Sequence, residues 1–264
     1  MKVTVEQVTP RKAAKWLETN TKNRPVRLTY VDTLADEITE GRWKENGDSI
    51  RFNGTELIDG QHRLMAIVKA GKPIKSIVVR DLPGHVFDTI DVGRSRKAAD
   101  ILALRGETST ATLAAVARLT YLYDSGTMQT KSRKTVTATR IEGMIQDQPG
   151  IREAVNTWRS RVNKSKLAPS GPIIACYHIA SRLNRKQADD MMDKLVNGTA
   201  LRDDPFHVLR ERFIKMRLDK GSFNAEHYMA LTLKCWNAAR SGDPIGQLRY
   251  NDKGEQKEKF PVAK

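Results

Sequence analysis

The fold of this chain is decided by residues 46–71, whose sequence is NGDSIRFNGTELIDGQHRLMAIVKAG. Alternating apolar and polar residues predict a short strand, the pair Asn53-Gly54 is a strong signal for a two-residue hairpin turn, and residues 56–58 predict the returning strand. Apolar residues at helical spacing then predict a helix over residues 61–70, closed by a glycine. A polar cluster therefore lies where a strand runs into the start of a helix.

That cluster is Asp59-Gly60-Gln61-His62-Arg63, hereafter the 59–63 turn. The first turn of a helix leaves backbone N–H groups without intrahelical partners, and the helix dipole favours negative charge there. Gly60 allows a ligand to approach the backbone closely, and His62 and Arg63 add side-chain donors. These features predict a phosphate-binding turn. The alternative is structural: Asp59 caps the helix, and His62 and Arg63 are simply solvated.

The 59–63 turn and its strand–hairpin–helix setting resemble the ParB/sulfiredoxin superfamily, in its DGQHR-type branch, over residues 1–105. Members of this superfamily include DNA-partition proteins that bind and hydrolyse CTP, sulfiredoxins, free-serine kinases and nucleases. The resemblance implies a small mixed sheet with helices packed on it. It further implies that a nucleotide phosphate is bound by Gly60, Gln61, His62 and Arg63. The candidate cofactors are ATP or CTP with magnesium, and no residue is assigned as a metal ligand.

If the chain is an enzyme, the resemblance makes Asp59, His62 and Arg63 the catalytic candidates. Asp59 would bind metal or act as a base, and His62 and Arg63 would stabilise charge on phosphorus. The chain also departs from the superfamily. It lacks the Gly-Glu-Arg-Arg type turn of the partition proteins, so CTP specificity is not supported. Its only cysteines, Cys176 and Cys235, lie far from the turn in sequence, which argues against a sulfiredoxin activity.

The chain carries 46 Lys and Arg residues against 31 Asp and Glu residues, a formal net charge of +15 in 264 residues. This excess favours a polyanionic partner, and double-stranded DNA is the expected one. A membrane surface is the competing partner, but no expected helix has the Trp/Phe/Leu face opposite a basic face that membrane binding requires. Solubility alone is a further explanation of the charge.

Other features exclude several protein classes. The sequence has no run of about 18 apolar residues that could span a membrane, and its first residues lack the apolar core of a signal peptide. Two isolated cysteines provide neither a disulfide framework nor the spacing of a metal site. A Walker loop, a Gly-x-Ser-x-Gly elbow and the kinase signature set are also absent. We therefore expect a cytoplasmic protein.

The remaining pattern predicts an α+β protein: the small mixed sheet with helices, followed by a mostly helical domain. We expect domains at residues 1–105 and 106–241 and a polar, flexible tail at 242–264. In the first domain, a helix beginning at Pro10 is expected to bury Ala14 and Leu17. In the second domain, the expected helices cover residues 109–124, 137–146, 151–162, 172–184, 186–197, 205–218 and 224–240.

Basic residues in loops and near helix ends are the candidate contacts to nucleic-acid phosphates. One group lies in a second polar loop that precedes a helix, one in a polar linker, and one at the end of a helix. Such contacts provide affinity and salt dependence without reading sequence, and solvated charges are the alternative interpretation. In chain order, the candidates are Arg94, Arg96, Lys97, Lys131, Arg133, Lys134, Arg159, Arg161, Lys164 and Lys166.

The main functional hypothesis is a ParB-like DNA-binding protein of phage or bacterial mobile-element type, which holds a phosphate or nucleotide at the 59–63 turn. The alternatives are a phosphotransferase or metal-assisted nuclease that uses the same turn, and a regulatory interaction protein without catalysis. Whether the chain is an enzyme, and whether it forms a homodimer, stay open at this point.

Overall fold

The computed structural model shows an α+β protein that divides into two compact units, which confirms the expected fold class. The N-terminal unit comprises residues 1–95 and 134–137, and the helical unit comprises residues 96–133 and 138–264. The structure describes the whole chain except residues 22, 24, 84–96, 130–135, 220–222, 253 and 255.

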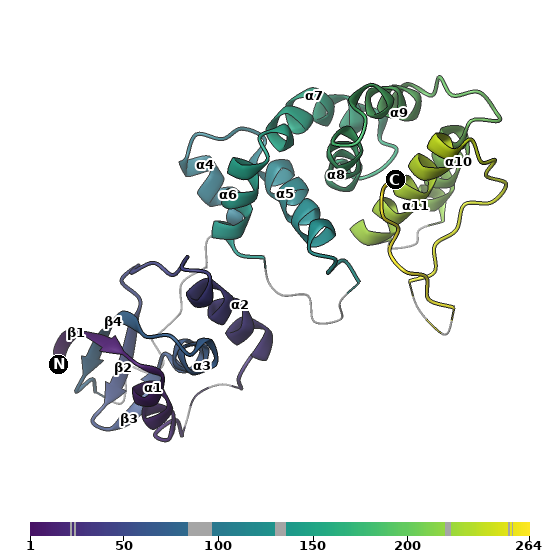
Figure 1. Ribbon diagram of the computed structural model, residues 1–264. Helices are drawn as coiled ribbons and strands as arrows, with labels where there is room; N and C mark the ends of the chain where they lie inside the picture. Colours follow the sequence, from purple (N-terminus) through teal and green to yellow (C-terminus); the bar gives the residue numbers. More distant parts are fainter. Residues whose placement is uncertain are drawn as a thin grey trace. The chain divides into compact units, whose positions relative to one another are not determined.

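The N-terminal unit contains a mixed sheet of four strands in the order β1-β4-β2-β3 (Figure 1). Strand β4 lies between β1, to which it is antiparallel, and β2, to which it is parallel. The parallel pair requires a crossover connection, and the hairpin strand β3 and helix α3 (Gln61–Ala70) provide it. The strands are β1 (Lys2–Val8), β2 (Ser49–Asn53), β3 (Glu56–Asp59) and β4 (Ile74–Arg80).

Helices α1 (Pro10–Leu17), α2 (Leu28–Thr39) and α3 share one apolar core with the sheet. Thr9 caps α1, because its hydroxyl accepts a hydrogen bond from the backbone N–H of Lys12. Of the two residues of α1 expected to be buried, Leu17 packs on the core but Ala14 does not. Ala13 is fully buried and Ala14 is exposed, because residues 13, 16 and 17, at i, i+3 and i+4 spacing, pack on the core.

The β2–β3 hairpin forms as expected, but its loop is displaced by one residue. Asn53 pairs with Glu56, so the two loop residues are Gly54 and Thr55 rather than Asn53 and Gly54. The register also shifts after Phe52 pairs with Leu57, and the next pair is Arg51 with Asp59. One extra residue on β3, a β-bulge, therefore places Asp59 directly opposite Arg51.

The helical unit is built around α8, in which ten consecutive residues, 171–180, are buried. A helix that is apolar on all sides must be covered on all sides, and α8 packs against α5, α7, α9 and α11. The helices of this unit are α4 (Ala98–Leu104), α5 (Thr110–Asp124), α6 (Ala138–Asp147), α7 (Gly150–Ser165), α8 (Ser170–Ser181), α9 (Arg185–Asn197), α10 (Pro205–Leu218) and α11 (Ala225–Ser241).

Two expectations about the domains differ from this structure. Helix α4, which the sequence analysis assigned to the first domain, packs on α5 and α6 in the helical unit. Residues 242–264, expected to be a flexible polar tail, pack on the same unit, since Leu248 and Tyr250 are buried. The indole N–H of Trp236 also donates to the backbone carbonyl of Lys264 over 3.1 Å. The apolar residues within this segment explain why it packs although its composition is polar.

Two further features concern the hydropathy of the helices and the state of the cysteines. Within the part of the chain that the structure describes, every helix is too short or too polar to cross a bilayer. Cys176 and Cys235 are both buried and unpaired, and burial raises the pKa of both thiols.

Candidate functional site

The 59–63 turn joins β3 to α3, and Gly60 is the residue that allows it. Gly60 has a φ of +105°, a backbone conformation that residues with a side chain rarely adopt. A Cβ atom at this position would lie 3.2 Å from Cγ1 and 3.3 Å from Cα of Ile50, which is fully buried on β2. The turn therefore lies directly against β2, and only glycine allows this close approach.

A cavity of about 200 Å³ opens at this turn. All five residues of the turn line it, together with Tyr30 of α2, Trp43 and Asp48 from the segment before β2, and Arg51 of β2. The share of liquid volume taken by one water molecule is about 30 Å³, and sites for drug-sized ligands measure about 300–1,000 Å³. The cavity thus has room for a group the size of a phosphate but not for a whole nucleotide.

Two arginines and two aspartates face one another in this cavity. Nη2 of Arg63 donates to Oδ2 of Asp59 over 3.0 Å, and Nη1 lies 3.7 Å from Oδ2 of Asp48. Nε of Arg51 lies 3.9 Å from Oδ2 of Asp59 and donates to the hydroxyl of Ser49 over 2.8 Å. Asp59 therefore holds both guanidinium groups at the turn. The side chain of Asp48 is 64% exposed and that of Asp59 only 17%, so Asp48 is the carboxylate that an incoming anion can displace.

His62 has a structural contact that the sequence did not predict. The ring is buried, and Nε2 accepts a hydrogen bond from the backbone N–H of Arg27 over 3.1 Å. A nitrogen that accepts carries no proton, so this contact requires the tautomer with the proton on Nδ1. Arg27 is the N-cap residue of α2, and His62 therefore ties the start of α2 to the start of α3.

Gln61 has a similar role on the other side of the turn. It is 4% exposed, and its Oε1 accepts a hydrogen bond from Nδ2 of Asn20 over 3.0 Å. Asn23 in turn donates to the side chain of Asn20 and to the backbone carbonyl of Leu57. This amide network fixes the segment after α1 to β3 and to the turn. Gly60 and the two arginines, rather than Gln61 and His62, are the parts of the turn suited to a ligand.

The expected phosphate contacts fall into three groups. Arg159 and Lys164 lie exposed on α7 and have no ion-pair partner among the described residues, and Lys97 is exposed at the start of α4. Arg161 is instead engaged: its guanidinium lies 4.4 Å from the ring centroid of Trp158 and forms an ion pair with Asp193. Lys166 ends α7, and its backbone carbonyl accepts from Arg217. The remaining five, Arg94, Arg96, Lys131, Arg133 and Lys134, lie outside the described residues.

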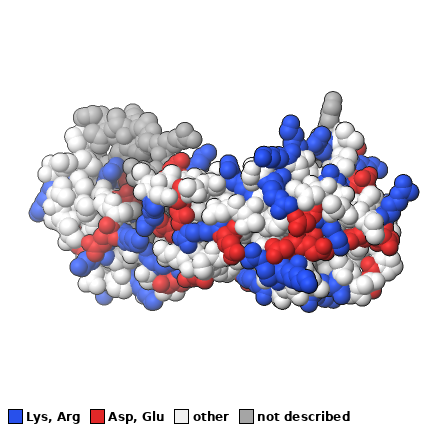
Figure 2. Space-filling model, turned by 90° about the horizontal axis from the view of Figure 1, so that it is seen from above, with Lys and Arg blue, Asp and Glu red and all other residues white. Residues whose placement is uncertain are grey.

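Charges of both signs are interspersed on the molecular surface. On the face shown in Figure 2, Lys and Arg side chains alternate with Asp and Glu side chains over the described residues. Ion pairs between described side chains include Arg185 with Glu153 and Lys194 with Asp190. On this face (Figure 2), the described Lys and Arg side chains therefore form no single uniform stripe.

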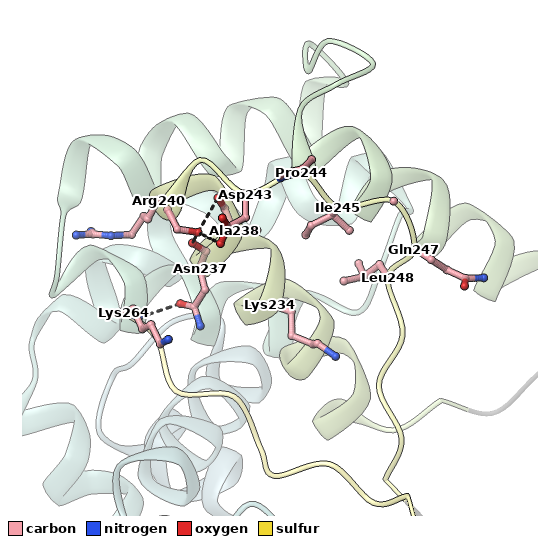
Figure 3. A pocket seen from close by; sticks show the side chains of 12 residues that line it. Lys234, Asn237, Ala238, Arg240, Asp243, Pro244, Ile245, Gln247, Leu248 and Lys264 are labelled. Carbon is pink, nitrogen blue, oxygen red and sulfur yellow. Dashed lines mark hydrogen bonds between the residues drawn. The ribbon is translucent and has the colours of Figure 1, made fainter.

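A larger cavity, of about 660 Å³, lies in the helical unit between α11 and residues 243–248 (Figure 3). Several of its polar groups are already engaged. Asn237 accepts from the backbone N–H of Lys264 and donates to the carbonyl of Val262, and Lys234 pairs with Glu258. These bonds fasten the final segment of the chain to α11. We regard this cavity as a hollow beneath that segment.

Among the residues that the structure describes, no three His, Cys, Asp or Glu side chains are grouped so as to hold a metal ion. Comparisons with protein-family models, with curated proteins and with solved structures found no match to this chain.

Sequence reasoning missed Arg51, Tyr30 and Trp43 as residues of the site, and Trp43 also packs on the core of the N-terminal unit. The β-bulge that places Arg51 opposite Asp59 is a local irregularity without a composition signal, so counting back from the hairpin turn pairs Arg51 with the wrong residue. Tyr30 and Trp43 come from elements that only tertiary packing brings to the turn.

Proposed function

We propose that this chain is a ParB-like DNA-binding protein that works in the cytoplasm, and that the cavity at the 59–63 turn binds one phosphate group. The observation that carries the proposal is the meeting of Arg51 and Arg63 in a cavity of phosphate size, directly against the glycine-containing start of α3. Guanidinium groups match phosphate oxygens in geometry as well as charge. The net charge of +15 supports a polyanionic partner.

The binding step begins from a site that is already neutralised internally. The two arginines are balanced by Asp48 and Asp59, so a phosphate gains most if it replaces the exposed Asp48 beside Arg63 while Asp59 keeps both guanidinium groups in place. The phosphate then meets two preoriented cations without reorganisation of the turn. The rest of the ligand stays outside the cavity, because 200 Å³ admits little more than the phosphate.

The geometry gives no comparable support to the catalytic alternative. A general base needs an acceptor within reach of the proton that it removes. Nε2 of His62 already accepts from a backbone N–H, and the Oδ2 of Asp59 lies within an ion pair. These contacts give His62 and Asp59 positioning roles, and a phosphate-release assay with ATP or CTP plus magnesium is the direct test of catalysis.

The proposal is tested by binding of a labelled DNA duplex and its separate strands over a salt series, with the wild-type protein and Arg63→Ala. Loss of a desolvated guanidinium–phosphate contact is expected to weaken binding at least about tenfold. The matched control is Lys69→Ala, which removes the same charge from the last turn of the same helix, at a side chain that is 56% exposed and pairs with Asp32. Lys69→Ala is expected to change affinity less than about twofold. Equal effects of the two variants, or no effect of Arg63→Ala, would reject the 59–63 turn as the site.

A further inference from the structure

The rim of the cavity carries an exposed aromatic ring. Tyr30 is 44% exposed, and among the residues that the structure describes it is the one aromatic side chain in the exposed class; the other described aromatic residues are buried or half-buried. Its ring lies edge-on to that of His62, with 5.5 Å between centroids and 61° between planes. His62 is itself held by a hydrogen bond from the backbone N–H of Arg27, so the ring that Tyr30 contacts has a fixed position.

Trp43 adds an unused donor to the same cavity. Its indole Nε1 is buried and has no hydrogen-bond partner among the described residues. A buried donor without a partner is destabilising, and natural proteins rarely leave one unsatisfied. Trp43 lines the cavity, but this nitrogen is closed off from solvent, so an acceptor atom of a ligand reaches it only if the ring shifts. The accessible groups of the site are therefore two cations and one exposed ring.

The volume of the cavity limits which part of a nucleotide can enter it. The cavity of about 200 Å³ has room for a phosphate but not for the sugar and base attached to it. A base joined to that phosphate must therefore lie at the rim, where Tyr30 is. In a duplex, the bases stack on one another and face their partners, so a ring at the rim cannot stack on them. In a single strand or a free nucleotide, the face of the base is available to an aromatic ring.

We infer that the cavity takes the phosphate of an unpaired nucleotide and that Tyr30 stacks on its base; this rests on the proposed phosphate binding at the 59–63 turn. The ligand chemistry is a phosphate joined to a nucleobase that is free of a pairing partner, either within a single strand or as a mononucleotide. A phosphate of a duplex can still meet Arg51 and Arg63, but without a base stacked on Tyr30, and exposed cations of the helical unit such as Arg159 and Lys164 add further contacts to a duplex.

The experiment measures affinity for three labelled ligands: a short single-stranded oligonucleotide, the same length of abasic sugar–phosphate backbone, and the matching duplex. The proteins are the wild type, Tyr30→Leu, Tyr30→Phe and Arg63→Ala. The control is Leu28→Ala, since Leu28 lies two residues earlier on α2, is 66% exposed and does not line the cavity. Circular dichroism of each variant establishes that it folds.

We expect Tyr30→Leu to weaken single-strand binding about 5- to 150-fold, the range of one base–aromatic stacking contact. Tyr30→Phe, which keeps the ring, and Leu28→Ala are expected to bind as the wild type does. The abasic ligand should bind the wild type as weakly as the oligonucleotide binds Tyr30→Leu, and Tyr30→Leu should not distinguish the two ligands. Duplex binding should be unchanged in Tyr30→Leu. Displacement of the oligonucleotide by a nucleoside monophosphate at similar concentration supports a free nucleotide as the ligand, and displacement by longer single strands only supports a strand.

Two results would overturn the inference, and they are distinguishable. If Arg63→Ala loses binding but Tyr30→Leu does not, the phosphate site stands and the stacked base is rejected. If neither variant changes affinity for any ligand, the phosphate site and the stacked base are rejected together. An equal loss of duplex and single-strand binding in Tyr30→Leu would also reject the unpaired nucleotide.

Discussion

Helix α3 in the N-terminal unit begins differently from the last three helices of the helical unit. The side chains of Asn184, Asp204 and Asn224 each accept a hydrogen bond from a backbone N–H in the first turn of α9, α10 and α11. Helix α3 begins at Gly60, which has no side chain for this purpose. A capped start is satisfied by its own sequence and serves stability, whereas the start of α3 is left beside a cavity with two arginines. Helices α2, α5, α7 and α8 also begin without a side-chain cap, so it is the adjoining cavity with Arg51 and Arg63 that marks the start of α3 as suited to a ligand.

The largest expected effect is that of Gly60→Ala. The variant forces a side chain into a φ of +105° and against Ile50, and we expect the free energy of unfolding to fall by about 4 kcal/mol, half from backbone strain and half from overpacking. The matched control is Gly242→Ala at the end of α11, where φ is +74° but no atom lies within 4 Å of the new Cβ, and about 2 kcal/mol is expected. Urea denaturation measures both. Equal losses would mean that the contact with Ile50 is unimportant.

The comparison extends to acid unfolding of the two units. Burial and the nearby charge of Arg182, opposed by Asp124, lower the pKa of His178 in the helical unit from 6.5 to about 4. The native state then keeps His178 neutral while the unfolded chain protonates, so stability is complete above pH 6.5 and falls by up to about 3 kcal/mol as the pH drops to 4. His178→Gln should remove this dependence in a series of urea titrations between these pH values. An unchanged slope in the variant would contradict it.

In the N-terminal unit, the corresponding loss is expected at lower pH. Hydrogen bonds from Arg80 and from Lys12 lower the pKa of Glu6 from 4.5 to about 2, against the opposing effect of burial. Stability from this carboxylate is present above pH 4.5 and is lost as the pH falls through 2. The helical unit should therefore weaken first on acidification, and spectroscopic probes in each unit, such as Trp16 and Trp236, can follow the two separately.

A smaller effect is expected for the caps. Asn184→Ala removes the acceptor for the N–H of Gln187, so the helical unit should lose about 1 kcal/mol, while Asn184→Gly should cost only a few tenths of that amount. Thermal or urea unfolding measures the difference, and nucleic-acid binding should not change. A loss of nucleic-acid binding in Asn184→Ala would contradict the expectation that the capped start of α9 serves stability only.

The smallest effect is expected at Asp48. Asp48→Asn removes the exposed carboxylate beside Arg63, and binding of a phosphate-bearing ligand should strengthen about two- to fivefold, the scale of one exposed ion pair. Asp32→Asn makes the same charge change in the same unit at an ion pair with Lys69, which does not line the cavity. Equal strengthening in both variants would indicate general electrostatics rather than competition between Asp48 and the ligand, and titration at low salt detects either.

Much of the secondary structure could be predicted because its signals are local. The periodicity of residues 61–70 predicted α3 with its observed bounds, and the helix expected at residues 205–218 likewise has the bounds of α10. The predictions were wrong where a shift of one residue changes which side chain of a helix is buried or how two strands pair. Ala13 and Ala14 are equivalent in sequence, but only Ala13 meets the core, and the hairpin loop lies at Gly54 and Thr55 because of the register of two packed strands.

The sequence by itself determined the α+β class, the strand–turn–helix setting of Gly60 and the clustering of polar groups in the 59–63 turn. Only the tertiary structure decided what those groups do. It placed Arg51, Tyr30 and Trp43 at the turn and engaged His62 and Gln61 in structural hydrogen bonds. The physical reason is that periodicity and turn chemistry act between neighbours in the chain, whereas a cavity is formed by elements that packing brings together from distant positions.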